Sequence, residues 1–257
     1  MRELDRTAAA QTTVPTPLEV ASIALVGRGR VGRTLATALR AAGYRAADPC
    51  GRGEPPSGAD AILLCVPDAE IPAAAAAVAG AAPYVGHTSG ATPLSALEPA
   101  GGEAFGLHPL QTIPAGGADL RGCGAGVAGS TPAALELARA MATRLGMVPF
   151  ELRDSQRAAY HAAASIASNF LVTLEWAAQS VAARAGVDAP FGPLARTAVE
   201  NWIAAGPHAA LTGPIARGDE ATVAAQREAV AGAAPEFVAM FDALAERTRA
   251  LAAEARA

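Results

Sequence analysis

Apolar residues form short continuous runs in the first half of the chain and longer mixed stretches in the second half. The runs at 22–26 and 60–66 end at glycine and proline, which is typical of parallel strands covered on both faces. Further strands are predicted at 44–47, 84–87, 104–109, 126–129 and 147–152, and intervening helices at 34–40, 69–80 and 135–145. The alternation predicts an α/β domain.

From Asp154 the strands cease and helical patterns continue to Leu251. Asp154 or Ser155 can cap the first helix, which is predicted to reach Arg184. We therefore expect a Rossmann-type doubly wound sheet at 19–153 and an all-α C-terminal domain at 154–257. The polar segment 1–18 is predicted to be a disordered leader.

The sequence GRGRVG follows the first predicted strand, fits G-x-G-x-x-G and leads into a helix. Gly27 would allow the tight turn, Gly29 the approach of backbone amides to a pyrophosphate, and Gly32 close helix packing. The alternative is a glycine-rich turn without a ligand. The order of strand, turn and helix favours a dinucleotide site, with cofactor-binding candidates Gly27, Arg28, Gly29, Arg30, Val31, Gly32, Arg52, Val66 and Pro67.

Two observations bear on the choice of cofactor. Asp48 stands roughly twenty residues beyond the first glycine, where an acid binds the ribose diol of NAD. Arg45 and Arg52 flank it, and an arginine in this region pairs with the 2′-phosphate of NADP, to which Arg28 could add. The alternative for each arginine is a solvated surface charge. We predict NADP, with NAD as the other possibility.

Candidate catalytic residues lie at the ends of predicted strands and on the first long helix. His87 and His108 end predicted strands, so each would either face the cofactor or hold a loop through backbone hydrogen bonds. His161, Ser165 and Asn169 are spaced i, i+4 and i+8, which places them on one helix face. This row would either hold a substrate or make internal hydrogen bonds. The predicted catalytic residues are His161, Asn169, His108 and Ser165.

The loop at 211–219 holds two candidates for substrate binding, Thr212 and Arg217. A guanidinium can hold a carboxylate through two parallel hydrogen bonds. The alternative for Arg217 is an ion pair with Asp219 that braces the loop.

Composition excludes several classes of partner and reaction. The formal net charge of −4 gives no single-sign field, so neither nucleic acid nor a membrane is expected as a partner. The chain has no lysine, which excludes a Schiff base and a lysine acid. The cysteines Cys50, Cys65 and Cys123 form no C-x-x-C, so no metal site is expected. With no signal-peptide pattern, we expect a cytoplasmic protein.

Six motifs together resemble a family of Rossmann-like proteins with a C-terminal helical domain of unknown function, within the 6-phosphogluconate dehydrogenase-like superfamily. They are VGRGRVG, LLCVPDAEI, GHTSGA, FGLHPLQT, YHAAASIASNF and ALTGPIARGDEATV. The superfamily includes ketopantoate, pyrroline-5-carboxylate and prephenate reductases and dehydrogenases. The resemblance implies NAD(P) at Gly27, Gly29 and Gly32, and a homodimer formed through the helical domain.

The resemblance implies an NAD(P)-dependent oxidoreductase that acts on a small oxo acid, hydroxy acid or imine, with some members similar to ketopantoate reductases. Superfamily dehydrogenases often carry a catalytic lysine on the first interdomain helix, whereas here Arg157 stands just ahead of His161. Arginine is a poor proton donor, so any acid would be His161 or His108. The alternative is a dinucleotide-binding sensor or scaffold without turnover.

Overall fold

The structure is a computed structural model that describes residues 16–51, 53–54, 56 and 58–255. Most of the predicted leader, and Arg52, therefore lie outside the described residues. The chain divides into two compact units, Met1–Ala164 and Ser165–Ala257. The division falls within the helical stretch rather than at Asp154, where the strands end.

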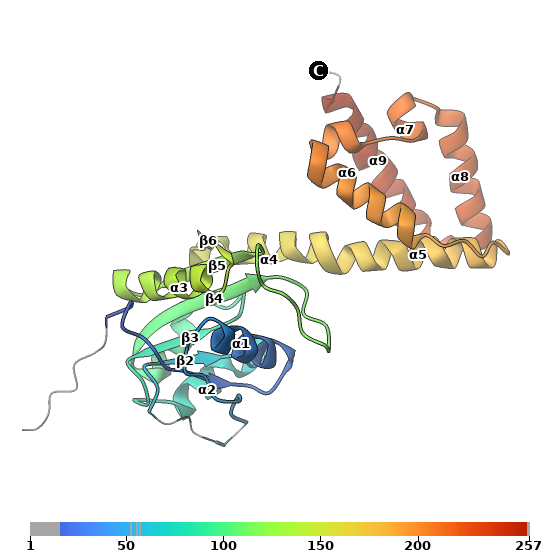
Figure 1. Cartoon of the computed structure of the whole chain (residues 1–257). Helices are drawn as coiled ribbons and strands as arrows, with labels where there is room; N and C mark the ends of the chain where they lie inside the picture. The colour runs from blue at the N-terminus through green and yellow to red at the C-terminus, as the bar shows by residue number, and fades with distance from the viewer. Residues whose placement is uncertain (1–15, 52, 55, 57, 256–257) are drawn as a thin grey trace, which may run out of the picture. The chain divides into compact units, whose positions relative to one another are not determined.

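The first unit is built on a six-stranded sheet whose strands lie in chain order (Figure 1). The first four strands run parallel, β5 is antiparallel to β4, and β6 is parallel to β5. The strands are β1 (Ile23–Val26), β2 (Ala61–Leu64), β3 (Tyr84–His87), β4 (Glu103–Leu110), β5 (Gly124–Gly129) and β6 (Val148–Glu151). The mostly parallel sheet confirms the predicted Rossmann-type fold.

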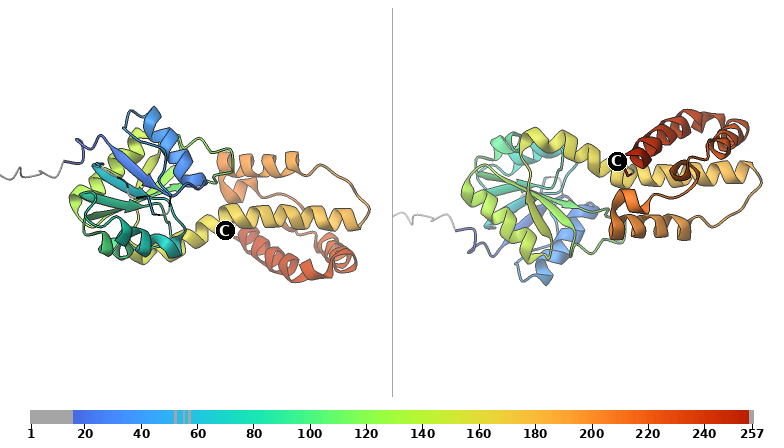
Figure 2. Two further views of the ribbon diagram at one scale, coloured as in Figure 1. Left: turned by 90° about the horizontal axis from the view of Figure 1, so that it is seen from below. Right: turned by 90° about the horizontal axis from the view of Figure 1, so that it is seen from above.

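Helices cover both faces of this sheet because its strands are apolar on both sides. Leu25 and Leu63 face α1 (Arg30–Ala41) and α3 (Pro132–Arg144), whereas Ile62 and Leu64 face α2 (Ile71–Ala77). Figures 1 and 2 show the blue helix α1 and the teal helix α2 on opposite sides of the strands. The predicted start of α3 is confirmed, since Thr131 caps it through Ala134 N.

The predicted strand at 44–47 is wrong. Among the described residues, this segment forms one isolated parallel bridge, Arg45 with Ser22 just before β1, and Cys50 farther along forms another with Val26 at the end of β1. From Arg45 to Cys50 the segment is one residue longer than the stretch of β1 that it faces, so a continuous ladder cannot form. The bridges still leave β1 with neighbours on both sides.

The second unit is helical. Its helices are a π-helix (Ile166–Phe170), α5 (Leu171–Arg184), α6 (Gly192–Ala210), α7 (Pro214–Arg217), α8 (Glu220–Ala233) and α9 (Val238–Glu254). α6 bends at Gly206, whose φ is 77°, just before Pro207. A small core of Ala177, Val230, Ala234 and Phe237 holds α5 against α8 and the start of α9, with Trp176 edge-on to Phe237.

The described part of the chain contains neither a membrane-spanning helix nor a cluster of metal-ligating side chains. No described helix combines the length and the apolar character needed to span a bilayer. Among the same residues, no group of histidine, cysteine, aspartate and glutamate side chains is arranged to hold a metal ion.

Candidate functional site

The carboxyl ends of β1 to β4 meet at one edge of the sheet because these strands are parallel. β1 runs into Gly27 and β2 into Cys65, while β3 and β4 carry His87 and His108 toward their ends. In open α/β sheets ligands bind outside this edge. Several of the predicted site residues therefore lie along one edge.

The three motif glycines have different surroundings. Gly27 has a φ of 115°, and a Cβ there would lie 2.3 Å from the Cys65 carbonyl oxygen. A Cβ on Gly32 would lie 2.0 Å from the Gly27 carbonyl oxygen. Gly29 has an ordinary φ of −69°, and a Cβ there would meet nothing within 4 Å. The fold itself requires Gly27 and Gly32, whereas Gly29 leaves open space at the N-terminus of α1.

That open space belongs to a cavity of about 1020 Å³. The cavity is bounded by the glycine turn, by Gly51, Gly53 and Glu54, by the segment after β2, and by α2 from Ala73 to its end. Of the predicted cofactor residues, those that line it are Gly27, Arg28, Gly29, Val66 and Pro67. α1 begins here without an acidic residue in its first turn, so its free amides and dipole favour an anion. The cavity fits a nucleotide phosphate.

The charged residues expected to select the cofactor are placed differently. Arg28 lines the cavity, donates from Nε to the Pro49 carbonyl at 3.2 Å, and forms an ion pair with Glu54 at 2.5 Å. The Gly51 amide and Arg28 lower the pKa of Glu54. Asp48 pairs with Arg40 at 3.0 Å and is 92% exposed. Within the described residues, Arg28 is the one of these candidates that lines the cavity.

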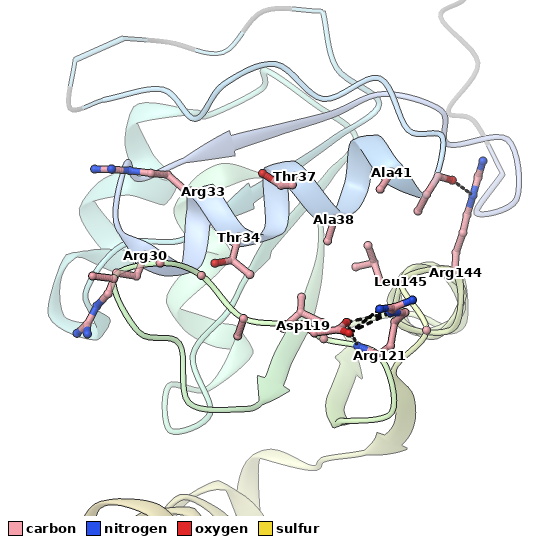
Figure 3. Close-up of a pocket in the computed structure, with 17 residues that line it drawn as sticks. Arg30, Arg33, Thr34, Thr37, Ala38, Ala41, Asp119, Arg121, Arg144 and Leu145 are labelled. Carbon is pink, nitrogen blue, oxygen red and sulfur yellow. Dashed lines mark hydrogen bonds and ion pairs between the residues drawn. The ribbon is translucent and has the colours of Figure 1, made fainter.

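Arg30 lines a second cavity, of about 980 Å³, between α1, the loop at 115–121 and the turn at 144–146. Figure 3 shows Arg30 and Arg33 toward one end of α1, and Arg121 and Arg144 near the other. Arg121 is bonded to Asp119, and Arg144 lies over the Tyr44 ring at 4.3 Å. The predicted cofactor residues Arg30 and Val31 are thus absent from the lining of the first cavity.

His87 is fully buried at the end of β3 and holds the loop that follows. Its Nδ1 accepts a hydrogen bond from the Ser89 amide at 3.2 Å. Burial, aided by the charge of Arg157, lowers its pKa to about 4, so it is neutral at neutral pH. These contacts fit the loop-holding alternative for His87.

His108 lies close to Tyr160, to His161 and to the loop that contains Gly90. Its Nδ1 lies 2.7 Å from the hydroxyl of Tyr160, and its ring lies 6.5 Å from that of His161. A Cβ on Gly90 would lie 2.9 Å from His108 Cε1, so this loop passes close to the imidazole. Burial first, and then His161, lower the pKa of His108 to about 4.

Tyr160 is the site residue that the sequence did not predict. It belongs to α4 (Arg157–Ser165), and its ring packs edge-on against Phe150 at 5.6 Å. Burial raises its pKa to about 12, so the hydroxyl stays protonated at neutral pH. The only local signal was its place beside His161.

Arg157 braces the site instead of facing it. Its side chain is 3% exposed, and its Nε donates to Asp154 at 2.6 Å. A second bond, from Nη1 to the Ser89 carbonyl at 3.3 Å, ties the start of α4 to the loop after β3. Arg157 therefore fixes the helix that carries Tyr160 and His161.

The remaining candidates belong to the second unit. Ser165 precedes the π-helix and Asn169 lies within it. Hydrogen bonds in a π-helix join residues five positions apart, so the regular i, i+4 spacing that would align Ser165 with Asn169 on one face does not apply there. Thr212 lies in the loop before α7, and Arg217 is the last residue of α7. Both side chains are exposed. Asp219 caps α8 through the Thr222 amide at 3.1 Å, and among described contacts it forms no ion pair with Arg217. The roles of these four residues stay predictions.

The sheet, the glycine turn and the helices that follow define a Rossmann-type protein with a C-terminal helical unit. Residues 123–248 match the family described as a domain of unknown function, DUF2520. The match begins just before β5 and extends into α9. It confirms the resemblance to Rossmann-like proteins that carry this domain. No curated protein matches the chain.

Solved structures share this fold. A Bacteroides fragilis protein provisionally named an NADP oxidoreductase is 19% identical, with 90% of this chain and 98% of that chain covered and a TM-score of 0.76. A Thermotoga maritima protein is 21% identical over 91% and 100%, with a TM-score of 0.74. The pyrroline carboxylate reductase of Plasmodium falciparum, solved with NADP bound, is 11% identical over 90% and 98%, with a TM-score of 0.56. At these identities the likeness concerns the fold alone.

Proposed function

We propose that this protein is an NAD(P)-dependent oxidoreductase, with NADPH favoured, that transfers hydride between the nicotinamide and a small oxo acid, hydroxy acid or imine. The observation that carries this proposal is the contrast among the motif glycines: the fold requires Gly27 and Gly32, while Gly29 opens on a cavity. The NADP named for two proteins of the same fold supports the choice of cofactor.

In this proposal the amides of the first turn of α1 hold the pyrophosphate, and Arg28 exchanges Glu54 for the 2′-phosphate of NADP. The bound nicotinamide supplies or accepts the hydride. His108, neutral at neutral pH, donates a hydrogen bond to the substrate, and His161 supplies the proton. Ser165, Asn169, Thr212 and Arg217 remain the candidate substrate-binding residues of the second unit, for a ketopantoate reductase-like reaction.

Gly29→Ala tests the cofactor site. Because a Cβ there meets no protein atom, the variant is expected to fold normally. Its methyl group occupies space that the pyrophosphate needs, so we expect NADPH affinity to fall by about 100-fold or more, a loss of about 2.7 kcal/mol. Calorimetric titration with NADP(H) and NAD(H), together with thermal unfolding, measures both effects.

Gly116→Ala is the matched control, because Gly116 also has open space and an ordinary φ but does not line this cavity. It should bind cofactor as the wild type does. If the wild type binds neither dinucleotide, or Gly29→Ala binds NADPH normally, the cofactor proposal is wrong.

The second candidate is a dinucleotide-binding sensor or scaffold without turnover. It is favoured by the absence of lysine and by the lowered pKa of His108, which makes this ring a poor proton donor near neutral pH. His161→Ala would separate the two functions, since loss of turnover with intact NADPH affinity supports catalysis.

The cysteines are free, which fits the cytoplasmic location that we also propose.

We further propose that the protein is a homodimer formed through the helical unit. α6 contains no buried residue, although Leu194, Trp202 and Ile203 are apolar and 67%, 54% and 70% exposed. Leu194 and Trp202 are eight residues apart and so lie on one helix face. Large exposed apolar surfaces mark interaction sites, and most soluble oligomers are homo-oligomers.

Trp202→Glu is expected to convert this dimer to a monomer, because it places a charge in the apolar contact. Light scattering coupled to size-exclusion chromatography at micromolar concentration measures the mass. Arg196→Glu is the control. Arg196 is also exposed on α6 but is not one of the apolar residues named above, so this variant should remain dimeric. A monomeric wild type would refute the proposal.

A further inference from the structure

The hydroxyl of Tyr160 contacts one ring nitrogen of His108. The bond joins Tyr160 Oη and His108 Nδ1 at 2.7 Å, and the Gly90 loop lies about equally close to both ring nitrogens, since a Cβ on Gly90 would lie 3.1 Å from Nδ1 and 3.0 Å from Nε2. A neutral imidazole has one protonated and one bare nitrogen, so this contact bears on which nitrogen carries the proton.

The contact has two conceivable orientations, and the chemistry favours one of them. A phenol is a stronger hydrogen-bond donor than a neutral imidazole N–H, and a bare imidazole nitrogen accepts more strongly than a phenol oxygen. Within the described residues, the Tyr160 hydroxyl has no other hydrogen-bond partner, so its proton is used by His108 Nδ1. His108 must then carry its own proton on Nε2.

We propose that Tyr160 is a positioning residue that holds His108 in the neutral tautomer protonated at Nε2, so that Nε2–H donates a hydrogen bond to the substrate at the carboxyl edge of the sheet. The part that concerns the substrate rests on the oxidoreductase function proposed above. The tautomer itself does not depend on that function.

The groups around His108 support a neutral ring. The charges that act on it come from His161 and Arg157 on α4 and from Asp68 after β2. His161 and Arg157 disfavour the imidazolium and Asp68 favours it, and burial adds the largest effect against it. His108 therefore acts as a hydrogen-bond donor near neutral pH, and a transferred proton comes from His161 or water.

Ring ¹⁵N NMR of the full-length protein tests the tautomer directly, because protonated and bare imidazole nitrogens have well-separated shifts. The chain has four histidines, and the signals missing from His108→Gln assign His108. Between pH 6 and 8 we expect a bare Nδ1 and a protonated Nε2 in the wild type. In Tyr160→Phe, which keeps the ring packed on Phe150, we expect a mixture of both tautomers.

Tyr44→Phe is the matched control, since it removes a tyrosine hydroxyl elsewhere in the first unit and should leave the His108 signals unchanged. Protonation of His108 at Nδ1 in the wild type, or an unchanged tautomer in Tyr160→Phe, would overturn the proposal. Equal thermal unfolding of the wild type and Tyr160→Phe shows that a changed spectrum does not reflect unfolding.

The same variants connect the tautomer to catalysis. With any oxo acid or imine that the wild type reduces, Tyr160→Phe should lower kcat by about tenfold or more and change KM little, because a mis-set donor weakens transition-state stabilisation. A wild type that turns over nothing refutes the oxidoreductase function and leaves the NMR result standing. Turnover that is normal in Tyr160→Phe refutes the positioning role instead.

Discussion

Gly27→Ala is expected to destabilise the first unit by about 3 kcal/mol or more, which is a large share of the stability of a domain this size. The backbone at Gly27 has a φ of 115°, where L-residues are strained, and the new Cβ would lie 2.3 Å from the Cys65 carbonyl oxygen. That oxygen belongs to the backbone and cannot rotate away. Relief would require moving the end of β2 or the start of α1, and both positions bound the cavity beside the glycine turn.

Urea denaturation followed by far-UV circular dichroism measures this loss. Tryptophan fluorescence is unsuitable because Trp176 and Trp202 both lie in the second unit. Hydrogen exchange at the β1 and β2 amides adds a local measurement. Gly29→Ala is the comparison and should unfold as the wild type does, so equal unfolding midpoints for the two variants would contradict the prediction.

Much of the fold could be predicted because its signals are local. Continuous apolar runs closed by glycine or proline identify β1 and β2, and the strand, glycine turn and helix order identifies the start of the Rossmann-type unit. The failure at 44–47 has a different origin. Whether this segment pairs depends on its register against β1, a long-range property that strand-like composition does not encode.

The candidate site was only partly predictable for the same reason. Strand ends place His108 at the sheet edge, and His161 follows from the polar pattern of the helix. Tyr160 was missed because its partner is 52 residues away and nothing in the local pattern distinguishes it from a packing residue. Arg157 had a usable signal, since Asp154 precedes it by three residues. That spacing alone does not reveal that the guanidinium is buried.

Burial of Arg157 leads to the second large effect. Asp154→Ala is expected to cost about 3 kcal/mol, even though the Asp154 carboxylate is itself half-exposed, because it leaves a buried guanidinium without its counter-charge. The Ser89 carbonyl, at 3.3 Å, is neutral and compensates only in part. Arg157→Met should cost less, about 1 kcal/mol, because it removes the buried charge and fills a similar volume.

Urea denaturation of the two single variants and the double variant tests this order. If the uncompensated guanidinium causes the loss, Arg157→Met should rescue Asp154→Ala, and the double variant should match Arg157→Met alone. A greater loss in Arg157→Met than in Asp154→Ala would show that the packing of Arg157 matters more than its charge. Arg157 ties the start of α4 to the loop that contains Ser89, and Tyr160 on the same helix bonds the His108 ring. Asp154→Ala should therefore also change the ¹⁵N signals of the His108 ring.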